Sequence, residues 1–515
     1  MEKYLNDAII GNKNMLATFS SKGEMLRLSY PNHDNRQYLK YFRTGVKVND
    51  SNIIYLHDDI NNTYIQYYDT DTNILNTEIT NTYFNLKIVQ TDFVTIKEDV
   101  LVKKYSFIND SNIEQDIKFL IHSELLSDQN NFISGMKLDN GMVQFAHDFS
   151  MATFSKSEKI FSGQINGISN NIGSGIIGGK DYVGMSKDSG ISFDIGKLPA
   201  GHRKDIEICI YIDENKKTMH DFIDEVERIR KIDFNKELND TKAYWRKYVK
   251  EHDGLKIKEP QNSYEEKILN VYKRSILLFP LLMNEETGGI IASPEVDEEL
   301  SQCGRYAYCW PRDAVFITQA LDILKMNKEA DKFYSEFCRI TQSKNGMWEQ
   351  RFYTDGRLAP CWGYQVDETA SVVYGVYNHY EYTKNEEFLK ENLHMCELAI
   401  TFLKKYVYDV LENTGKYSVS YDIWEENDRG IHMYSLASIF SAFDTMKKIY
   451  KALGKNISDF ENNRLKEEKI NKNIKEIDEL MLKVKEYIEQ NLYDENRKSY
   501  VRNTEDRRID ISLLG

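Results

Sequence analysis

The chain has 515 residues, enough for a large core and more than one domain. Its 67 Lys and Arg against 81 Asp and Glu give a net charge of −14, which disfavours nucleic acid and anionic lipid as partners. Hydrophobic residues at 41% and charged residues at 29% exclude a disordered or collagen-like chain. We therefore expect a folded enzyme or binding protein.

The start of the chain, residues 1–14, carries acidic and amide side chains where a secretory signal needs a basic end and an apolar run. The longest apolar run, residues 276–283, is too short for a membrane span and contains proline. The six cysteines show no CxxC spacing, so neither a zinc site nor a disulfide framework is indicated. These features predict a soluble cytoplasmic protein without a metal or other cofactor.

Residues 1–213 show the apolar period of two that is typical of half-buried strands. Isoleucine stands at every second position from 206 to 212, and Ile117, Phe119 and Ile121 alternate with their neighbours. Turn signals at 109–110, 139–141 and 199–201 separate such runs. We predict an antiparallel β-sandwich domain here, without a catalytic centre.

The period changes to that of a helix near Lys216, and residues 214–262 are predicted as a charged helical linker. From residue 263 to 515 amphipathic helices alternate with loops, without a clear strand pattern, which favours an all-helical domain. The expected helices are 264–283, 313–325, 327–343, 367–382, 386–408, 432–453 and 470–490. Paired helices of this number predict a toroid that is not closed, and the apolar, helix-like residues 510–515 lead us to expect that the sequence stops within the domain.

Several common catalytic motifs are missing or misplaced. The G-x-G-x-x-G match at 173–178 lies among β-type segments and no helix follows it, so a sandwich loop is favoured over a phosphate site. Neither H-E-x-x-H nor G-x-S-x-G occurs. Zinc proteolysis and serine hydrolysis therefore lack their usual residues.

The first informative segment, residues 305–313, precedes a helix whose first turn is marked by proline and an acid. Arg312 and Asp313 supply donors and acceptors suited to vicinal sugar hydroxyls, and Tyr306 and Trp310 supply flat walls. A buried Arg–Asp ion pair among packing aromatic rings is an equally good interpretation.

The second segment, residues 361–368, again puts aromatic residues before acids at a helix start. Asp367 and Glu368 are best explained by the helix dipole. Trp362 is the better candidate for substrate contact.

The third segment, residues 421–428, places Glu425 and Glu426 beside Trp424. Apolar surroundings and a neighbouring carboxylate favour the neutral form of a carboxyl group, so we expect one of these glutamates to stay protonated near neutral pH, as a glycosidase acid must. A solvated acidic patch is the alternative, and the presence of three aromatic-plus-acid segments at successive helix entries weakens it.

The motifs YAYCWPRD (306–313), GYQVDE (363–368) and YDIWEE (421–426) resemble signature segments of glycoside hydrolase family 15, the glucoamylases and related glucan hydrolases. Residues 292–295 resemble the strip before the first motif. Residues 10–12 and 68–75 are similar to the bacterial and archaeal branch, which carries an N-terminal β-supersandwich. The resemblance extends over essentially the whole chain.

This resemblance implies an (α/α)6 barrel that releases β-glucose with inversion from the non-reducing ends of α-glucans or malto-oligosaccharides. The implied roles are Glu425 as general acid, Trp424 and Glu426 on the acceptor side, Arg312 and Asp313 on the terminal glucose, and Tyr306, Trp310 and Trp362 as its walls. Inversion also needs a carboxylate base, which the resemblance puts beyond Gly515. We therefore expect a fragment whose barrel lacks its last helices and which alone is inactive.

Two alternatives stay open. An inverting disaccharide phosphorylase shares the implied architecture and uses phosphate in place of base and water. A non-catalytic glycan-binding pseudoenzyme would explain the missing base. The sequence leaves open the preferred linkage, among α-1,4, α-1,6 and trehalose-type, and the oligomeric state.

Overall fold

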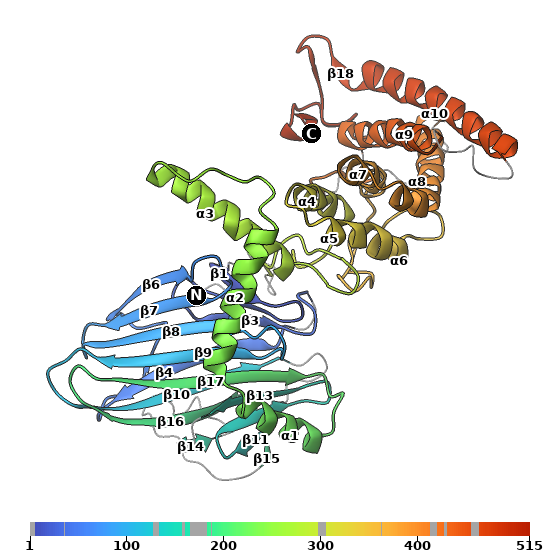
Figure 1. The fold of residues 1–515 in the computed structure, drawn as a ribbon. Coiled ribbons are helices and arrows are strands. Elements are labelled where there is room, and N and C mark those ends of the chain that lie inside the picture. Colours follow the sequence, from blue (N-terminus) through green and yellow to red (C-terminus); the bar gives the residue numbers. More distant parts are fainter. Residues whose placement is uncertain are drawn as a thin grey trace. The chain divides into compact units, whose positions relative to one another are not determined.

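The computed structural model describes residues 6–34, 37–126, 133–156, 160–164, 183–186, 188–296, 305–361, 363–412, 420–426, 430–454 and 463–514. The chain divides into two compact units, drawn as ribbons in Figure 1. The first unit comprises Met1–Glu251, Ile257–Leu282 and Pro294–Tyr306, and the second comprises His252–Lys256, Met283–Ser293 and Ala307–Gly515. The glycine motif at 173–178 lies outside the described residues.

The first unit contains two antiparallel sheets, as its period-two pattern predicts. In spatial order one sheet has β1 (Ala8–Gly11), β2 (Leu16–Phe19), β3 (Met25–Ser29), β4 (Leu39–Val48), β10 (Gln115–Leu125), β16 (Asp188–Leu198) and β14 (Ile160–Gln164), with β5 (Ile54–Tyr55) paired to β4. The other has β15 (Val183–Ser186), β11 (Ile133–Leu138), β12 (Gly141–Phe145), β13 (Ser150–Ser155), β17 (Arg203–Asp213), β9 (Leu101–Asn109), β8 (Leu86–Val94), β7 (Leu75–Asn81) and β6 (Asn62–Tyr68).

The inner faces of the two sheets form one apolar core. Phe119 on β10 meets Tyr105 and Phe107 on β9, with ring centroids 4.6 Å and 5.6 Å away. All three rings are fully buried, and at about 25 cal/mol per Å² of buried apolar surface such rings hold the sheets together.

Two helices cover the other face of the second sheet. Helix α1 (Met219–Arg230) begins at Thr218, whose hydroxyl accepts from the Asp221 N–H, and α2 (Phe234–Glu251) follows. Phe222 of α1 and Phe234 of α2 share a buried cluster with Cys209 of β17. This explains why β17 is apolar and buried at every position from Ile208 to Ile212, since that part of the strand is covered on both faces. The segment predicted as a linker therefore contributes two helices that pack on the first unit.

The helices predicted after residue 263 are confirmed to within a few residues at most ends. They are α3 (Ser263–Leu278), α4 (Pro311–Ile323), α5 (Asn327–Lys332), α6 (Arg339–Thr341), α7 (Val366–Thr383), α8 (Glu386–Glu412), α9 (Met433–Gly454) and α10 (Asn463–Asn491). A π-helical segment, Phe333–Cys338, joins α5 to α6 within the predicted 327–343 helix. The short hairpin of β18 (Tyr493–Asp494) and β19 (Ser499–Tyr500) was not predicted, because two-residue strands carry no periodic signal.

Helix α7 is the centre of the second unit, because α4, α8 and α9 all pack against it. Its buried positions follow several faces, as expected of a helix surrounded by others. Within the described residues, none of the helices combines the length and the apolar character that crossing a membrane would take.

A buried histidine ties three helical segments together. His379 on α7 contacts Asp322 on α4 through Nδ1 at 2.7 Å and Asp331 on α5 through Nε2 at 3.0 Å. Burial by itself would lower the pKa of His379, but the hydrogen bonds to Asp322 and Asp331 raise it to about 9. The imidazolium is therefore charged at neutral pH and bridges two carboxylates.

The pH dependence of stability tests this bridge. The folded-state pKa of His379 lies above its unfolded value, so the stabilisation is complete below about pH 6.5 and is lost as the pH rises through 9. We expect His379→Gln to lower the Tm at pH 6, and the gap to the wild type to narrow by pH 10. Thermal melts across this pH range measure the difference in Tm, and His220→Gln, at an exposed residue, is the control. A gap of constant size would contradict the bridge.

Candidate active site

The second and third motif segments meet in the second unit just before α7 begins. The Val366 N–H donates to Ser420 Oγ at 3.0 Å, and the Tyr421 N–H donates to the Tyr364 carbonyl at 3.1 Å. A Cβ on Gly363 would come within 2.2 Å of the Tyr421 ring, so this close approach requires glycine. The loop that carries the acidic pair is therefore fixed to the entry of α7.

Glu425 occupies a turn in this loop, here called the acid loop (residues 420–426). Its N–H donates to the Asp422 carbonyl at 3.0 Å, and its φ of 58° lies in the left-handed region that non-glycine residues seldom adopt. The carboxyl is partly exposed, and its Oε1 accepts a hydrogen bond of 2.8 Å from the indole Nε1 of Trp310. The first and third motif segments thus meet at the predicted general acid.

Trp310 is buried and supported from behind by a cation. The Arg351 guanidinium lies 5.3 Å from the Trp310 ring and 4.9 Å from the Tyr308 ring, while its Nε donates to the Pro360 carbonyl. Arg351 was not found from the sequence because it lies outside the three motifs. Its contacts hold the indole N–H in line with Glu425.

Arg312 lies in a buried cluster of charges. Its Nη1 donates to Asp367 Oδ2 at 2.8 Å and to Gln365 Oε1 at 3.1 Å, and its backbone N–H donates to Glu368 Oε2 at 2.6 Å. Asp367 and Glu368 are fully buried, so the prediction that they serve only the helix dipole was incomplete. They neutralise Arg312, and Glu368 also caps the start of α4.

Burial governs the protonation of this cluster. It raises the pKa of Glu368 well above the usual range, and the attraction of Arg312 opposes this rise only in part. Burial would also lower the pKa of Arg312, but Glu368, Asp367 and Asp313 raise it well above its usual value. Arg312 therefore stays charged, while burial disfavours ionisation of Glu368.

Asp313 is the member of this cluster that faces solvent. Its side chain is 41% exposed, and its Oδ2 accepts from Arg312 Nη2 at 3.1 Å. Of the predicted pair, Asp313 is therefore open to a ligand, and Arg312 fixes it from inside.

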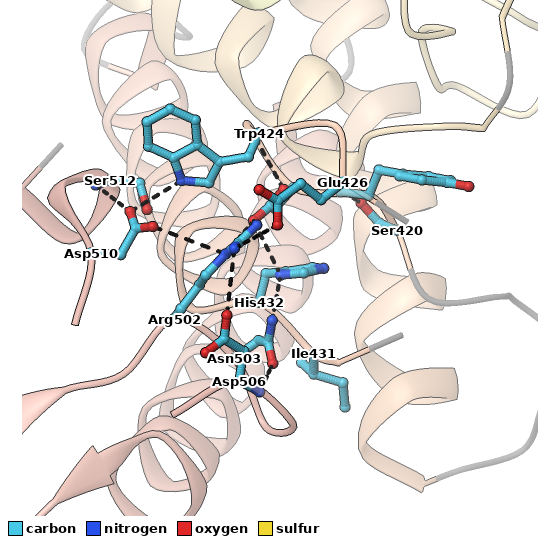
Figure 2. Close-up of polar contacts among 12 residues, drawn as sticks. Ser420, Trp424, Glu426, Ile431, His432, Arg502, Asn503, Asp506, Asp510 and Ser512 are labelled. Carbon is cyan, nitrogen blue, oxygen red and sulfur yellow. Dashed lines mark hydrogen bonds and ion pairs between the residues drawn. The ribbon is translucent and has the colours of Figure 1, made fainter. Parts of the chain in front are cut away.

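The two other acid-loop candidates are exposed and held by residues near the end of the chain (Figure 2). Trp424 is 47% exposed, and its Nε1 donates to Asp510 Oδ1 at 3.1 Å. Glu426 forms an ion pair of 2.7 Å with Arg502. The sequence analysis found neither Arg502 nor Asp510, since neither belongs to a motif.

The two remaining candidates are Tyr306 and Trp362. Tyr306 belongs to the first unit, where its N–H donates to the Glu295 carbonyl at 3.1 Å. Trp362 lies outside the described residues. The described part of the chain contains no group of three or more His, Cys, Asp or Glu residues placed to hold a metal ion.

Comparison with known proteins agrees with this arrangement of motifs. Residues 266–515 match the family model "Glycosyl hydrolases family 15". Residues 266–515 belong to glycosyl hydrolase family 15. The family places the chain among the glycoside hydrolases, and its family 15 segment contains all three motifs.

Two curated relatives are similar to the chain. An uncharacterised glycosyl hydrolase of Methanocaldococcus jannaschii is 26% identical over 98% of this chain and 77% of its own length. A trehalase of Mycolicibacterium smegmatis is 25% identical over 31% of this chain and 25% of its own length. The first likeness therefore includes the β-sheet unit as well as the family 15 segment.

Solved structures share the fold. A bacterial glucoamylase complexed with acarbose matches 99% of this chain and 71% of its own, with 15% identity and a TM-score of 0.74. A family GH92 α-mannosidase of Bacteroides thetaiotaomicron matches 98% and 65%, with 12% identity and a TM-score of 0.52. Antiparallel sheets followed by a helical part are thus confirmed as the architecture.

The charge cluster of the family 15 segment yields a stability prediction. Arg312→Met leaves two buried carboxyl groups without their cation, at an expected cost of about 3–5 kcal/mol, measured as a lower Tm at pH 7. Adding Asp367→Asn to Arg312→Met should recover part of the lost stability.

Arg357→Met is the matched control, because Arg357 forms an exposed ion pair with Asp355. We expect little change in its Tm. A double variant no more stable than Arg312→Met would contradict the assignment of the cluster.

Proposed function

We propose that this glycoside hydrolase is an inverting, exo-acting enzyme that releases β-glucose from the non-reducing ends of malto-oligosaccharides or related α-glucans. The observation that carries the proposal is the Trp310–Glu425 hydrogen bond of 2.8 Å, which joins the third motif to the first within the family 15 segment. The resemblance stated above makes this glutamate the general acid.

Glu425 protonates the bridging oxygen as the glycosidic bond breaks. The Trp310 N–H engages Oε1 alone, which leaves Oε2 to carry the proton toward the sugar. The left-handed backbone at Glu425 is a strained conformation of the kind that is retained at functional sites. The partly exposed carboxyl is open to substrate.

The remaining residues bind the two sides of the scissile bond. Asp313, which Arg312 holds in place, accepts hydrogen bonds from hydroxyls of the terminal glucose. Tyr306, Trp310 and Trp362 are proposed as the apolar walls of that sugar. Trp424 and Glu426, both exposed, are proposed for the acceptor side.

Inversion requires a second carboxylate about 6.5–9.5 Å from the acid, which activates water on the opposite face of the sugar. No residue of the described part of the chain is assigned to this role, and the assays below use the full-length protein.

The anomer of the product tests the reaction class. We expect proton NMR to show β-glucose as the first product from maltotetraose, at a rate independent of added phosphate. Glucose 1-phosphate formed only with phosphate would favour the phosphorylase, and binding without any product would favour the glycan-binding alternative. Trehalose and isomaltose belong in the substrate panel, the first because of the trehalase relative.

Glu425→Gln tests the general acid. We expect it to lower kcat on maltose by about 10²- to 10⁴-fold, and to change turnover of α-glucosyl fluoride within about fivefold, because fluoride leaves without protonation. Steady-state kinetics on both substrates measure this difference. Glu387→Gln on α8, an exposed residue, is the control. Equal losses on both substrates would remove Glu425 from this role.

Trp310→Phe keeps the aromatic wall and removes the N–H donor. Glu425 becomes charged as it gives up its proton, and a hydrogen bond to a charged group contributes about 1.5–3 kcal/mol, so we expect kcat on maltose to fall roughly 10- to 100-fold. The Tm should change little. Trp245→Phe in the first unit is the comparison variant, because the Trp245 indole nitrogen has no hydrogen-bond partner among the described residues. Unchanged kcat would show that Trp310 does not orient the acid.

A further inference from the structure

We infer that Arg502 is a positioning residue for the general acid, and that it acts by clamping the acid loop through Asp422 and Glu426. The inference rests on the proposed function, because it takes Glu425 as the proton donor. It adds a residue from outside the three motifs to the catalytic apparatus.

Arg502 contacts residues that lie before and after Glu425 in the chain, and Figure 2 shows it beside Glu426, Asp506 and Asp510. Nε and Nη2 donate to the same oxygen, Oδ2 of Asp422, at 3.1 Å and 2.9 Å, and Nη1 lies 2.7 Å from the Glu426 carboxylate. Arg502 and Asp422 are both buried. One guanidinium therefore holds residues 422 and 426 together and leaves the acid between them free.

Asp422 passes this restraint to the backbone of the acid loop. Its Oδ1 accepts the Trp424 N–H at 3.0 Å, and its carbonyl accepts the Glu425 N–H at 3.0 Å. The same carbonyl accepts from Gln365 Nε2 at 2.6 Å, and Gln365 Oε1 accepts from Arg312. The Asp422 position therefore determines the turn at Glu425 and relates it to the sugar-binding cluster.

Arg502 is itself fixed by main-chain hydrogen bonds. Its carbonyl accepts the Met433 N–H at the start of α9 at 2.9 Å, and its N–H donates to the Arg508 carbonyl at 2.9 Å. The neighbouring Asn503 forms a β-bridge with His432. Because its backbone is held in this way, Arg502 can support the strained turn at Glu425 rigidly.

The surrounding charges make the arginine necessary. Four carboxylates lie around it, those of Asp422, Glu426, Asp506 and Asp510, at 2.9, 2.7, 3.4 and 4.0 Å. His432 Nδ1 lies 3.5 Å from Asp422, and Arg508 pairs with Asp506 at 2.6 Å. Without Arg502 the buried Asp422 carboxylate loses its main partner and repels Glu426, which opens the loop.

Lysine at position 502 keeps the charge and removes the planar fork that holds two carboxylates at once. We expect Arg502→Lys to lower kcat on maltose by about 30- to 300-fold, and turnover of α-glucosyl fluoride by less than about fivefold, because only the first substrate depends on an aligned proton donor. Arg497→Lys, an exposed residue in the preceding hairpin that pairs with Asp494, should leave both rates unchanged.

Asp422→Asn is the second variant, for the case in which Arg502→Lys does not fold. It retains the side-chain shape and should show the same selective loss on maltose. The double variant should lose little more than either single variant, because both remove one contact. Circular dichroism and thermal melts accompany each assay.

Equal losses on both substrates, no loss on maltose in either variant, or additive losses in the double variant would overturn the inference. These outcomes are distinct from failure of the proposed function. If Glu425→Gln is not selective between the substrates, the proposed function fails. If Glu425→Gln is selective and the variants at positions 502 and 422 are not, only the role of Arg502 fails.

Discussion

The hydrogen bond between the Trp310 indole and the Glu425 carboxyl is the interaction on which the site depends. It joins residues separated by 115 positions, and each partner is held from behind by other groups. Arg351 supports the indole ring, and the turn at Asp422 sets the backbone of the glutamate. A carboxyl group can act on a bound sugar only if such contacts fix its direction before substrate arrives.

Two arginines organise the charges around this bond in the same way. Arg312 neutralises the acids at the start of α7, and Arg502 neutralises those of the acid loop. Gln365 connects the two groups, because it accepts from Arg312 and donates to the Asp422 carbonyl. In both cases the cation is buried while the carboxylates proposed for substrate binding, Asp313 and Glu426, are exposed. The arginines thus act as a scaffold for acids that face solvent.

The elements and several of the site residues could be predicted from the chain alone because their signals are local. Alternating isoleucines mark β17, and a proline followed by an acid marks the start of α4. The left-handed φ at Glu425 and the short hairpin before Arg502 had no such signal, because neither depends on apolar periodicity. The sequence also did not show what the helices at 219–251 pack against, because their apolar face covers residues of a sheet whose strands come from earlier in the chain.

The sequence by itself determined the β-then-α order, most helix bounds, the family resemblance and the identity of the acidic pair in the third motif. Only the tertiary structure decided which partners these residues have. Arg312 is buried against Asp367, and Arg502 reaches Asp422 across 80 positions. The physical reason is that periodicity reports which face of an element is buried, whereas a polar contact between distant residues depends on how the loops are brought together by the packing of the helices.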